Sequence, residues 1–228
     1  MTLIAEKPKV LARFSQITIE EGSEGRLADA AGCLARCYLK DNPLMACSGL
    51  AVEAFEPIAT YLIGAALEAG IAVFAVDESR NRVVGVSLAE DYAHCDPIRD
   101  MQELDPLFHP LLNLFGVMDE RLKAEEDVAE GQWLYHAFLN VESKDIEGVG
   151  VAAQISAQLC EATFAAARAK GYQFCVGHTT NLFSQRLYRK MGFEPRVEIA
   201  YRDYVFNGEH VYADVKWHHS AVLGVASL

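Results

Sequence analysis

The chain has 228 residues, of which 20 are Lys or Arg and 32 are Asp or Glu, so that its formal net charge is −12. Apolar residues make up 51% and charged residues 23%, a balance typical of a globular protein and unlike a disordered or fibrous one. This acidic charge argues against a nucleic-acid-binding protein, which needs a basic surface, and favours encounters with cationic partners. No repeat or linker divides the chain, so we expect a single domain over residues 1–228.

No segment of the sequence predicts a membrane-spanning or secreted protein. The longest apolar stretch, residues 61–76, contains Glu68, and each half is far shorter than the ~20 residues that a membrane helix needs. The chain starts without the basic end and apolar core of a secretory signal. Six cysteines are too few for a dense disulfide framework, and Cys33 and Cys37 have no second pair at zinc-ligand spacing. We therefore expect reduced thiols, no metal and a cytoplasmic location.

Hydrophobic periodicity and turn residues predict the elements in chain order. These are a strand at 14–19, helices at 22–40 and 51–69, an antiparallel hairpin of strands at 71–77 and 82–91, an amphipathic helix within 91–130, a buried strand at 132–141, a helix at 148–170, a strand at 172–179, a short helix at 182–191, and strands at 197–205 and 210–216. Pro57 is tolerable in its helix if it lies in the first turn, and we expect Gly192 as a left-handed helix end. His218 and His219 are interpreted as a surface tail. This order predicts a mixed α/β (α+β) fold, not a regular doubly wound sheet.

The helical segment at 91–131 differs in charge from the rest of the chain. Residues 91–130 hold 11 acidic and 3 basic side chains, and therefore carry −8 of the net charge. The segment is predicted to be an insertion between two strands. It forms either a solvated face or a surface that attracts a cationic ligand to a nearby site.

Two glycines lie where a buried strand is predicted to lead into a helix. Gly148 and Gly150 allow positive φ and close approach of a ligand to the backbone. The free N–H groups of a helix start suit a phosphate or diphosphate, although small residues in this position often serve packing alone. The letters also satisfy the G-x-G-x-x-A pattern of dinucleotide-binding units. That pattern needs a carboxylate at the end of the next strand, and residues 177–181 contain none, so we reject it.

A more specific pattern follows at residues 181–193, which read N-L-F-S-Q-R-L-Y-R-K-M-G-F. Placed after a glycine-opened helix and a strand, this run resembles the GNAT-type N-acetyltransferase superfamily, whose corresponding helix reads N-x-x-A-x-x-L-Y-x-K-x-G-F. The resemblance covers the element order over residues 13–217 and is specific over 132–193. Residues 38–44 (Y-L-K-D-N-P-L) and 198–209 further resemble the arylalkylamine N-acetyltransferase-like branch.

The resemblance implies a splayed, mostly antiparallel, twisted sheet of six to seven strands with helices on both faces. Acetyl-coenzyme A (acetyl-CoA) would bind as cosubstrate where the strand at 132–141 separates from the strand at 172–179. The implied cofactor-binding residues are Leu139, Asn140 and Val141 for the pantetheine; Glu147, Gly148, Val149, Gly150, Val151 and Ala152 for the diphosphate; and Asn181, Ser184 and Tyr188.

One loop departs from the family pattern. The family has Arg or Gln three residues before the first glycine, where this chain has Asp145, and Glu147 stands beside Gly148. Carboxylates near a diphosphate are unfavourable, and Lys144 is the one nearby residue in the sequence that offsets them. A catalytically silent acyl-CoA-binding regulatory module of the same fold therefore remains an alternative to an enzyme.

The resemblance also implies catalytic roles. Tyr188 matches the tyrosine that donates a proton to the departing thiolate, the alternative being a tyrosine that only packs at a helix edge. The backbone N–H of Leu139 lies where it would stabilise the oxyanion. His136 matches one of two strand histidines of the arylalkylamine enzymes and is either a base or an ordinary buried histidine. As a base it predicts a rate that rises with pH between roughly 6 and 8.

Further candidates for the base are carboxylates. Glu90 ends a predicted strand, and Asp41 and Asp91 are substitutes. Insect members of the branch carry an acidic residue where this chain has Asn42, which cannot act as a base.

We therefore expect an N-acetyltransferase that moves an acetyl (acyl) group from acetyl-CoA to a primary amine by direct attack in a ternary complex. The amine is small, such as an arylalkylamine or a polyamine, and neither nucleic acid nor membrane is expected as a partner. The oligomeric state is not encoded in any motif, and a homodimer is the commonest assembly.

Overall fold

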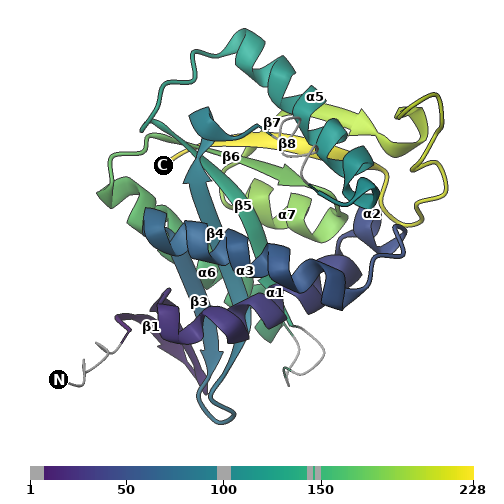
Figure 1. The fold of residues 1–228 in the computed structure, drawn as a ribbon. Helices are drawn as coiled ribbons and strands as arrows, with labels where there is room; N and C mark the ends of the chain where they lie inside the picture. The colour runs from purple at the N-terminus through teal and green to yellow at the C-terminus, as the bar shows by residue number, and fades with distance from the viewer. Residues whose placement is uncertain (1–7, 97–103, 143–145, 147–149) are drawn as a thin grey trace. The chain divides into compact units, whose positions relative to one another are not determined.

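The computed structural model describes residues 8–96, 104–142, 146 and 150–228 (Figure 1). Within these residues the chain divides into two compact units, each assembled from separate stretches. The first unit comprises the described residues within 8–38, 51–90 and 137–169, and the second comprises those within 39–50, 91–136 and 170–228. The expectation of one domain over the whole chain stays a prediction.

The first unit is built on five neighbouring strands. They are β1 (Val10–Phe14), β2 (Ile17–Glu21), β3 (Ala72–Asp77), β4 (Arg82–Asp91) and residues 137–141 of β5 (Trp133–Val141). The pairs from β1 to β4 are antiparallel, which confirms the predicted hairpin of β3 and β4. The single strand predicted at 14–19 is wrong, because the chain reverses at Ser15, whose φ is 52°.

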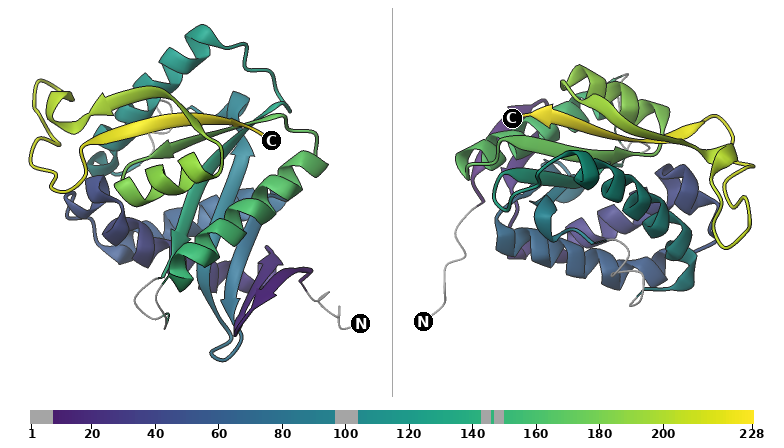
Figure 2. Two further views of the ribbon diagram at one scale, coloured as in Figure 1. Left: turned by 180° about the vertical axis from the view of Figure 1, so that it is seen from behind. Right: turned by 90° about the horizontal axis from the view of Figure 1, so that it is seen from above.

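Helices cover both faces of these strands. One face carries α1 (Leu27–Asp41), which follows a 3-10 turn at Glu24–Arg26, and α3 (Val52–Ala69); the other carries α6 (Val151–Ala169) (Figures 1 and 2). Ile155 and Leu159 of α6 pack against buried apolar residues of β2, β3 and β4. Pro57 lies inside α3, beyond its first turn, because the helix already begins at Val52.

The second unit is built on residues 133–136 of β5 with β6 (Phe174–Thr179), β8 (Ser220–Ser227) and β7 (Glu194–Ala200), in that order. β5 and β6 are parallel, and the other two pairs are antiparallel. The unit also contains the short helix α2 (Pro43–Ala46). Two longer helices, α5 (His109–Glu125) and α7 (Leu182–Lys190), lie on opposite faces of β6 and β8 (Figure 2). Short 3-10 turns occur at Tyr92–His94, Pro106–Phe108 and Tyr201–Asp203.

The described strands confirm a mixed α+β fold with a mostly antiparallel sheet. They number eight, not the expected six to seven. The additional strand comes from the hairpin of β1 and β2, which the sequence analysis treated as one strand.

The C-terminal segment differs most from expectation. Residues 210–216, predicted as a strand, contain no strand and form turns over 211–214, and the last strand is β8. His218 is not part of a free tail, because its Nδ1 accepts a hydrogen bond from the Leu182 N–H at 3.2 Å. β8 is buried over Ser220–Gly224, so its apolar run lacks the alternation that marks a half-buried strand. Gly192 ends α7 with a φ of 89°, as predicted.

The placement of β8 predicts a contrast between two apolar residues. Leu223 in β8 is fully buried, whereas Val211 in the turn segment is 39% exposed. Leu223→Ala should therefore lower the free energy of unfolding by about 2–5 kcal/mol, because it leaves a core cavity. Val211→Ala should change it by no more than about 0.5 kcal/mol. Urea unfolding of both variants measures the difference, and equal effects would contradict the assignment of β8.

Candidate active site

The pairing of β5 with β6 is short. It runs from Trp133–Phe174 to Tyr135–Val176, while β5 continues to Val141. Burial changes along the same strand: residues 133–136 are buried, and residues 137–141 are only partly buried. The resemblance implied that the strand at 132–141 separates from the strand at 172–179. The pairing ends at Tyr135–Val176, and the gap itself stays a prediction.

Backbone groups of the partly buried half of β5 alternate between the two edges of the strand. The Glu142 N–H donates to the Val84 carbonyl of β4 at 2.8 Å. Because neighbouring residues in an antiparallel strand point their N–H and C=O groups in opposite directions, those of Leu139 and Val141 point away from β4. This arrangement suits the backbone contacts predicted for Leu139 and Val141, whereas Asn140 faces β4. The contacts with pantetheine themselves stay predictions.

His136, the first residue of β5 after the ladder with β6, contacts Tyr188 of α7. Tyr188 Oη lies 2.7 Å from His136 Nδ1, and the two rings are inclined by 14°. The exposed fractions are 1% for His136 and 6% for Tyr188. The structure therefore brings together two predicted catalytic residues that are 52 positions apart in the sequence.

Burial determines the charge of this pair. It lowers the pKa of His136 to about 4, because the imidazolium would lose its hydration. His136 is therefore neutral at neutral pH, with one protonated and one bare nitrogen, so it can either donate to Tyr188 or accept from it. A base with this pKa is already deprotonated well below pH 6, which argues against a rate that rises between pH 6 and 8 through His136; its role as a base stays a prediction.

Gly177 of β6 makes room for Tyr188. A Cβ atom at Gly177 would overlap the Tyr188 ring, which packs on its other side against Phe193 with ring centroids 4.4 Å apart. A glycine inside a strand commonly marks such a close approach. The sequence analysis missed this role, although a glycine within the predicted strand at 172–179 was the available indication.

The carboxylates proposed as bases have different environments. Asp91 is structural, because its carboxylate accepts hydrogen bonds from the N–H groups of Ala93 at 2.9 Å and Gly131 at 2.7 Å. Asn42 caps α2, where its side chain accepts from the Leu44 N–H. Glu90 is exposed near the end of β4 in the first unit, and its role as a base stays a prediction.

Asn181 and Ser184 form the N-terminal cap of α7. Asn181 Oδ1 accepts from the N–H groups of Phe183 at 3.0 Å and Ser184 at 2.8 Å, and the Ser184 hydroxyl donates to the Asn181 carbonyl. This is the usual way in which asparagine satisfies the free N–H groups of a helix start. Their contacts with acetyl-CoA stay predictions.

The glycine-opened helix α6 begins at Val151, directly after Gly150. Gly150 is exposed and has a φ of 81°, so the positive φ expected of a glycine at this junction is present. Val151 and Ala152 occupy the first turn of the helix. Glu147, Gly148 and Val149, like Lys144 and Asp145, lie outside the described residues.

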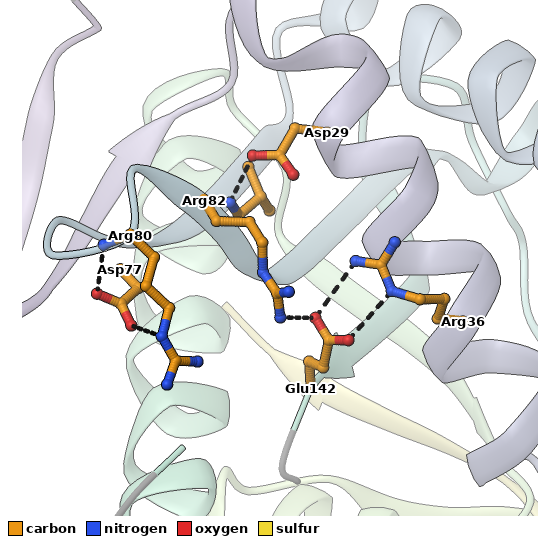
Figure 3. Close-up of polar contacts among 7 residues, drawn as sticks. Asp29, Arg36, Asp77, Arg80, Arg82 and Glu142 are labelled. Carbon is orange, nitrogen blue, oxygen red and sulfur yellow. Dashed lines mark hydrogen bonds and ion pairs between the residues drawn. The ribbon is translucent and has the colours of Figure 1, made fainter. Parts of the chain in front are cut away.

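Two arginines meet the end of β5 in the first unit (Figure 3). Arg36 of α1 donates to the Glu142 carboxylate at 3.1 and 3.3 Å, and Arg82 of β4 donates to it at 2.6 Å. Two guanidinium groups on one carboxylate leave one positive charge where β5 ends. The sequence analysis found only Lys144 to offset the acidic loop, because Arg36 and Arg82 are 106 and 60 positions from Glu142.

Acidic side chains of the insertion make contacts inside the second unit. Glu125 and Glu126 pair with Arg196 at 3.4 and 2.6 Å, and Asp119 is 3% exposed. The insertion is therefore more than a solvated acidic face.

No three His, Cys, Asp or Glu side chains of the described residues form a group that could hold a metal ion. None of the helices in the described part of the chain could span a membrane.

The lowered pKa of His136 predicts how stability responds to acid. The unfolded histidine binds a proton near pH 6.5 and the folded one only near pH 4, so protons favour the unfolded state between these values. Acidification over this range should cost the wild type up to about 3 kcal/mol through this residue, and His136→Gln should lack this contribution. Urea unfolding at several pH values measures both, and parallel curves would contradict the burial of a neutral His136.

No protein-family model and no curated protein matches the sequence. Several solved structures match the fold. The C-terminal condensation domain of Ebony, in complex with beta-alanyl-dopamine, has a TM-score of 0.80 at 12% identity and covers 94% of this chain and 100% of its own. Arylalkylamine N-acetyltransferase 2 from Aedes aegypti has a TM-score of 0.78 at 22% identity, covering 93% and 99%. The Drosophila melanogaster polyamine N-acetyltransferase has a TM-score of 0.72 at 20% identity, and the match covers 93% of this chain and 100% of that protein. The chain therefore has the fold of the GNAT-type N-acetyltransferases.

Proposed function

We propose that this protein is an enzyme that transfers an acetyl group from acetyl-CoA to a primary amine of a small molecule. The observation that carries the proposal is the pair of Tyr188 and His136, which stands directly after the last paired residue of β5. A buried phenol in contact with a buried imidazole supplies the proton donor that a departing thiolate needs.

The first unit supplies groups that fit the cosubstrate. Leu139 and Val141 offer backbone groups that extended amides can pair with, as an added strand would. Gly150 exposes backbone at the start of α6, where Val151 and Ala152 supply N–H groups that suit a diphosphate. The cosubstrate itself supplies the activated thioester.

The second unit supplies the proton chemistry. The amine nitrogen attacks the thioester carbon, the C–S bond breaks, and the thiolate takes a proton from the Tyr188 hydroxyl. A neutral His136 that carries its proton on Nδ1 donates to Tyr188 Oη and stabilises the phenolate that forms. His136 thus acts on Tyr188 and not on the amine. The group that takes the ammonium proton remains a proposal, with Glu90 as the candidate.

The acceptor class follows from charge and from the structural relatives. The net charge of −12 favours cationic amines. An arylalkylamine N-acetyltransferase and a polyamine N-acetyltransferase share the fold. We therefore include arylalkylamines and polyamines as acceptors in the proposal, together with a cytoplasmic location and a homodimer.

Turnover is tested with acetyl-CoA and a panel of arylalkylamines and polyamines, by measuring the release of the free thiol. Tyr188→Phe should lower kcat about 10- to 100-fold, because the thiolate loses its proton donor, while KM for acetyl-CoA changes little. Binding of acetyl-CoA without turnover of any amine would favour the silent regulatory module. Absence of binding at millimolar acetyl-CoA in calorimetry would reject both functions.

The acidic loop predicts a gain of affinity. Asp145→Arg should lower Kd for acetyl-CoA about 3- to 10-fold, because it exchanges a repulsion for an attraction of roughly 1 kcal/mol. S-acetyl-pantetheine, which lacks the diphosphate, should bind both proteins equally. Asp127→Arg makes the same charge change at an exposed residue of the insertion and is the matched control. An equal gain in Asp127→Arg, or none in Asp145→Arg, would contradict a diphosphate beside this loop.

A further inference from the structure

A buried polar cluster lies in the second unit, on strands β5 and β6 and the adjoining α5. Tyr135 Oη lies 3.1 Å from His178 Nδ1, and His178 Nε2 lies 3.0 Å from Asp119 Oδ1. Tyr92 donates its hydroxyl proton to the same Asp119 oxygen at 2.6 Å. The side chains of His178 and Asp119 are only 1% and 4% exposed.

The members of this cluster form a chain of close polar contacts. His178 Nδ1 lies at hydrogen-bond distance from the Tyr135 hydroxyl, whereas Nε2 lies at ion-pair distance from Asp119 and makes no hydrogen bond with any residue that the structure describes. Asp119 depends on these partners, because its second oxygen receives no hydrogen bond from any residue that the structure describes. Phe115 of α5 stacks on the His178 ring with centroids 4.3 Å apart and closes the cluster against water.

The cluster is joined to the His136–Tyr188 pair through the backbone of two strands. Tyr135 precedes His136 in β5, and His178 follows Gly177 in β6. Because successive side chains of a strand point to opposite faces, Tyr135 and His178 meet on one face while His136 and Tyr188 meet over Gly177 on the other. The contact of Tyr135 with His178 joins β5 to β6 directly. Tyr188 of α7 joins them indirectly, because it contacts His136 of β5 and lies over Gly177 of β6. Both connections lie where the pairing of β5 with β6 ends.

This inference rests on the proposed function. We propose that Asp119, His178 and Tyr135 are positioning residues that hold β5 and β6 at their point of separation, and thereby hold His136 against Tyr188. Asp119 restricts the orientation of the His178 ring, and His178, two residues after the last paired residue of β6, binds Tyr135, the last paired residue of β5. Buried ionisable pairs are often no more stabilising than apolar side chains of similar volume. We therefore expect this cluster to act on the geometry of β5 and β6 more than on the free energy of unfolding.

A double-mutant cycle with Tyr188 separates positioning from a general effect on folding. His178→Leu should lower kcat about 10-fold in the wild type and less than 2-fold in Tyr188→Phe, because its effect passes through Tyr188. KM for acetyl-CoA should stay within about 3-fold. Tyr135→Phe removes a single hydroxyl, keeps the ring and should follow the same pattern with a smaller loss. His178→Gln, which keeps a donor towards Asp119, should recover part of the activity.

The matched control breaks a buried hydrogen bond in the first unit. Thr163→Val removes the 2.6 Å contact with Ser87 and should change kcat by less than 2-fold in both backgrounds. Losses of equal factor in the wild type and in Tyr188→Phe, or no loss with His178→Leu and Tyr135→Phe, would overturn the proposal.

A second readout does not need turnover. In long-range proton–nitrogen spectra of the protein without ligand, His178→Leu and Tyr135→Phe should shift the imidazole resonances of His136. Unchanged His136 resonances would overturn the positioning role whatever the activity. If the wild type turns over no amine while these resonances shift, the proposed function fails and the structural coupling stands.

Discussion

The candidate site depends on where two parallel strands stop pairing. β5 and β6 share only three pairs, and the next residue of β5 is His136. Further along β5, in the first unit, the backbone N–H and C=O groups of Leu139 and Val141 point away from β4, and such groups need a partner. The same boundary gives Gly177 its function, because beyond the ladder the chain must admit the Tyr188 ring close to the backbone of β6.

The two faces of β5 and β6 then carry different chemistry. On the face of α7, a neutral imidazole and a phenol are buried together and can share a proton. On the face of α5, His178 lies close to both Asp119 and Tyr135. The acidic insertion thus contributes a buried carboxylate and an aromatic face to the second unit.

Strong local patterns made most of the fold predictable, and tertiary contacts account for the rest. The hairpin of β3 and β4, the helices α5 and α6 and the left-handed Gly192 follow from periodicity and cap chemistry. The strand β8 was missed because its burial on both faces removes the alternation that identifies a strand, and the reversal at Ser15 was missed because no glycine marks it. Tyr188 and His136 were named singly from the motif, but their contact, and the pKa that burial gives His136, arise only from packing.

The central claim concerns the edge of β5 that Leu139 and Val141 present, and amide hydrogen exchange at these two residues tests it most directly. Without ligand, both amides should exchange quickly, because neither donates to β4. Saturation with acetyl-CoA should slow both by at least about 10-fold, as expected of amides that gain a hydrogen-bond partner. Amides that are already protected in the free protein, or whose exchange acetyl-CoA leaves unchanged, would contradict a free strand edge that binds the cosubstrate.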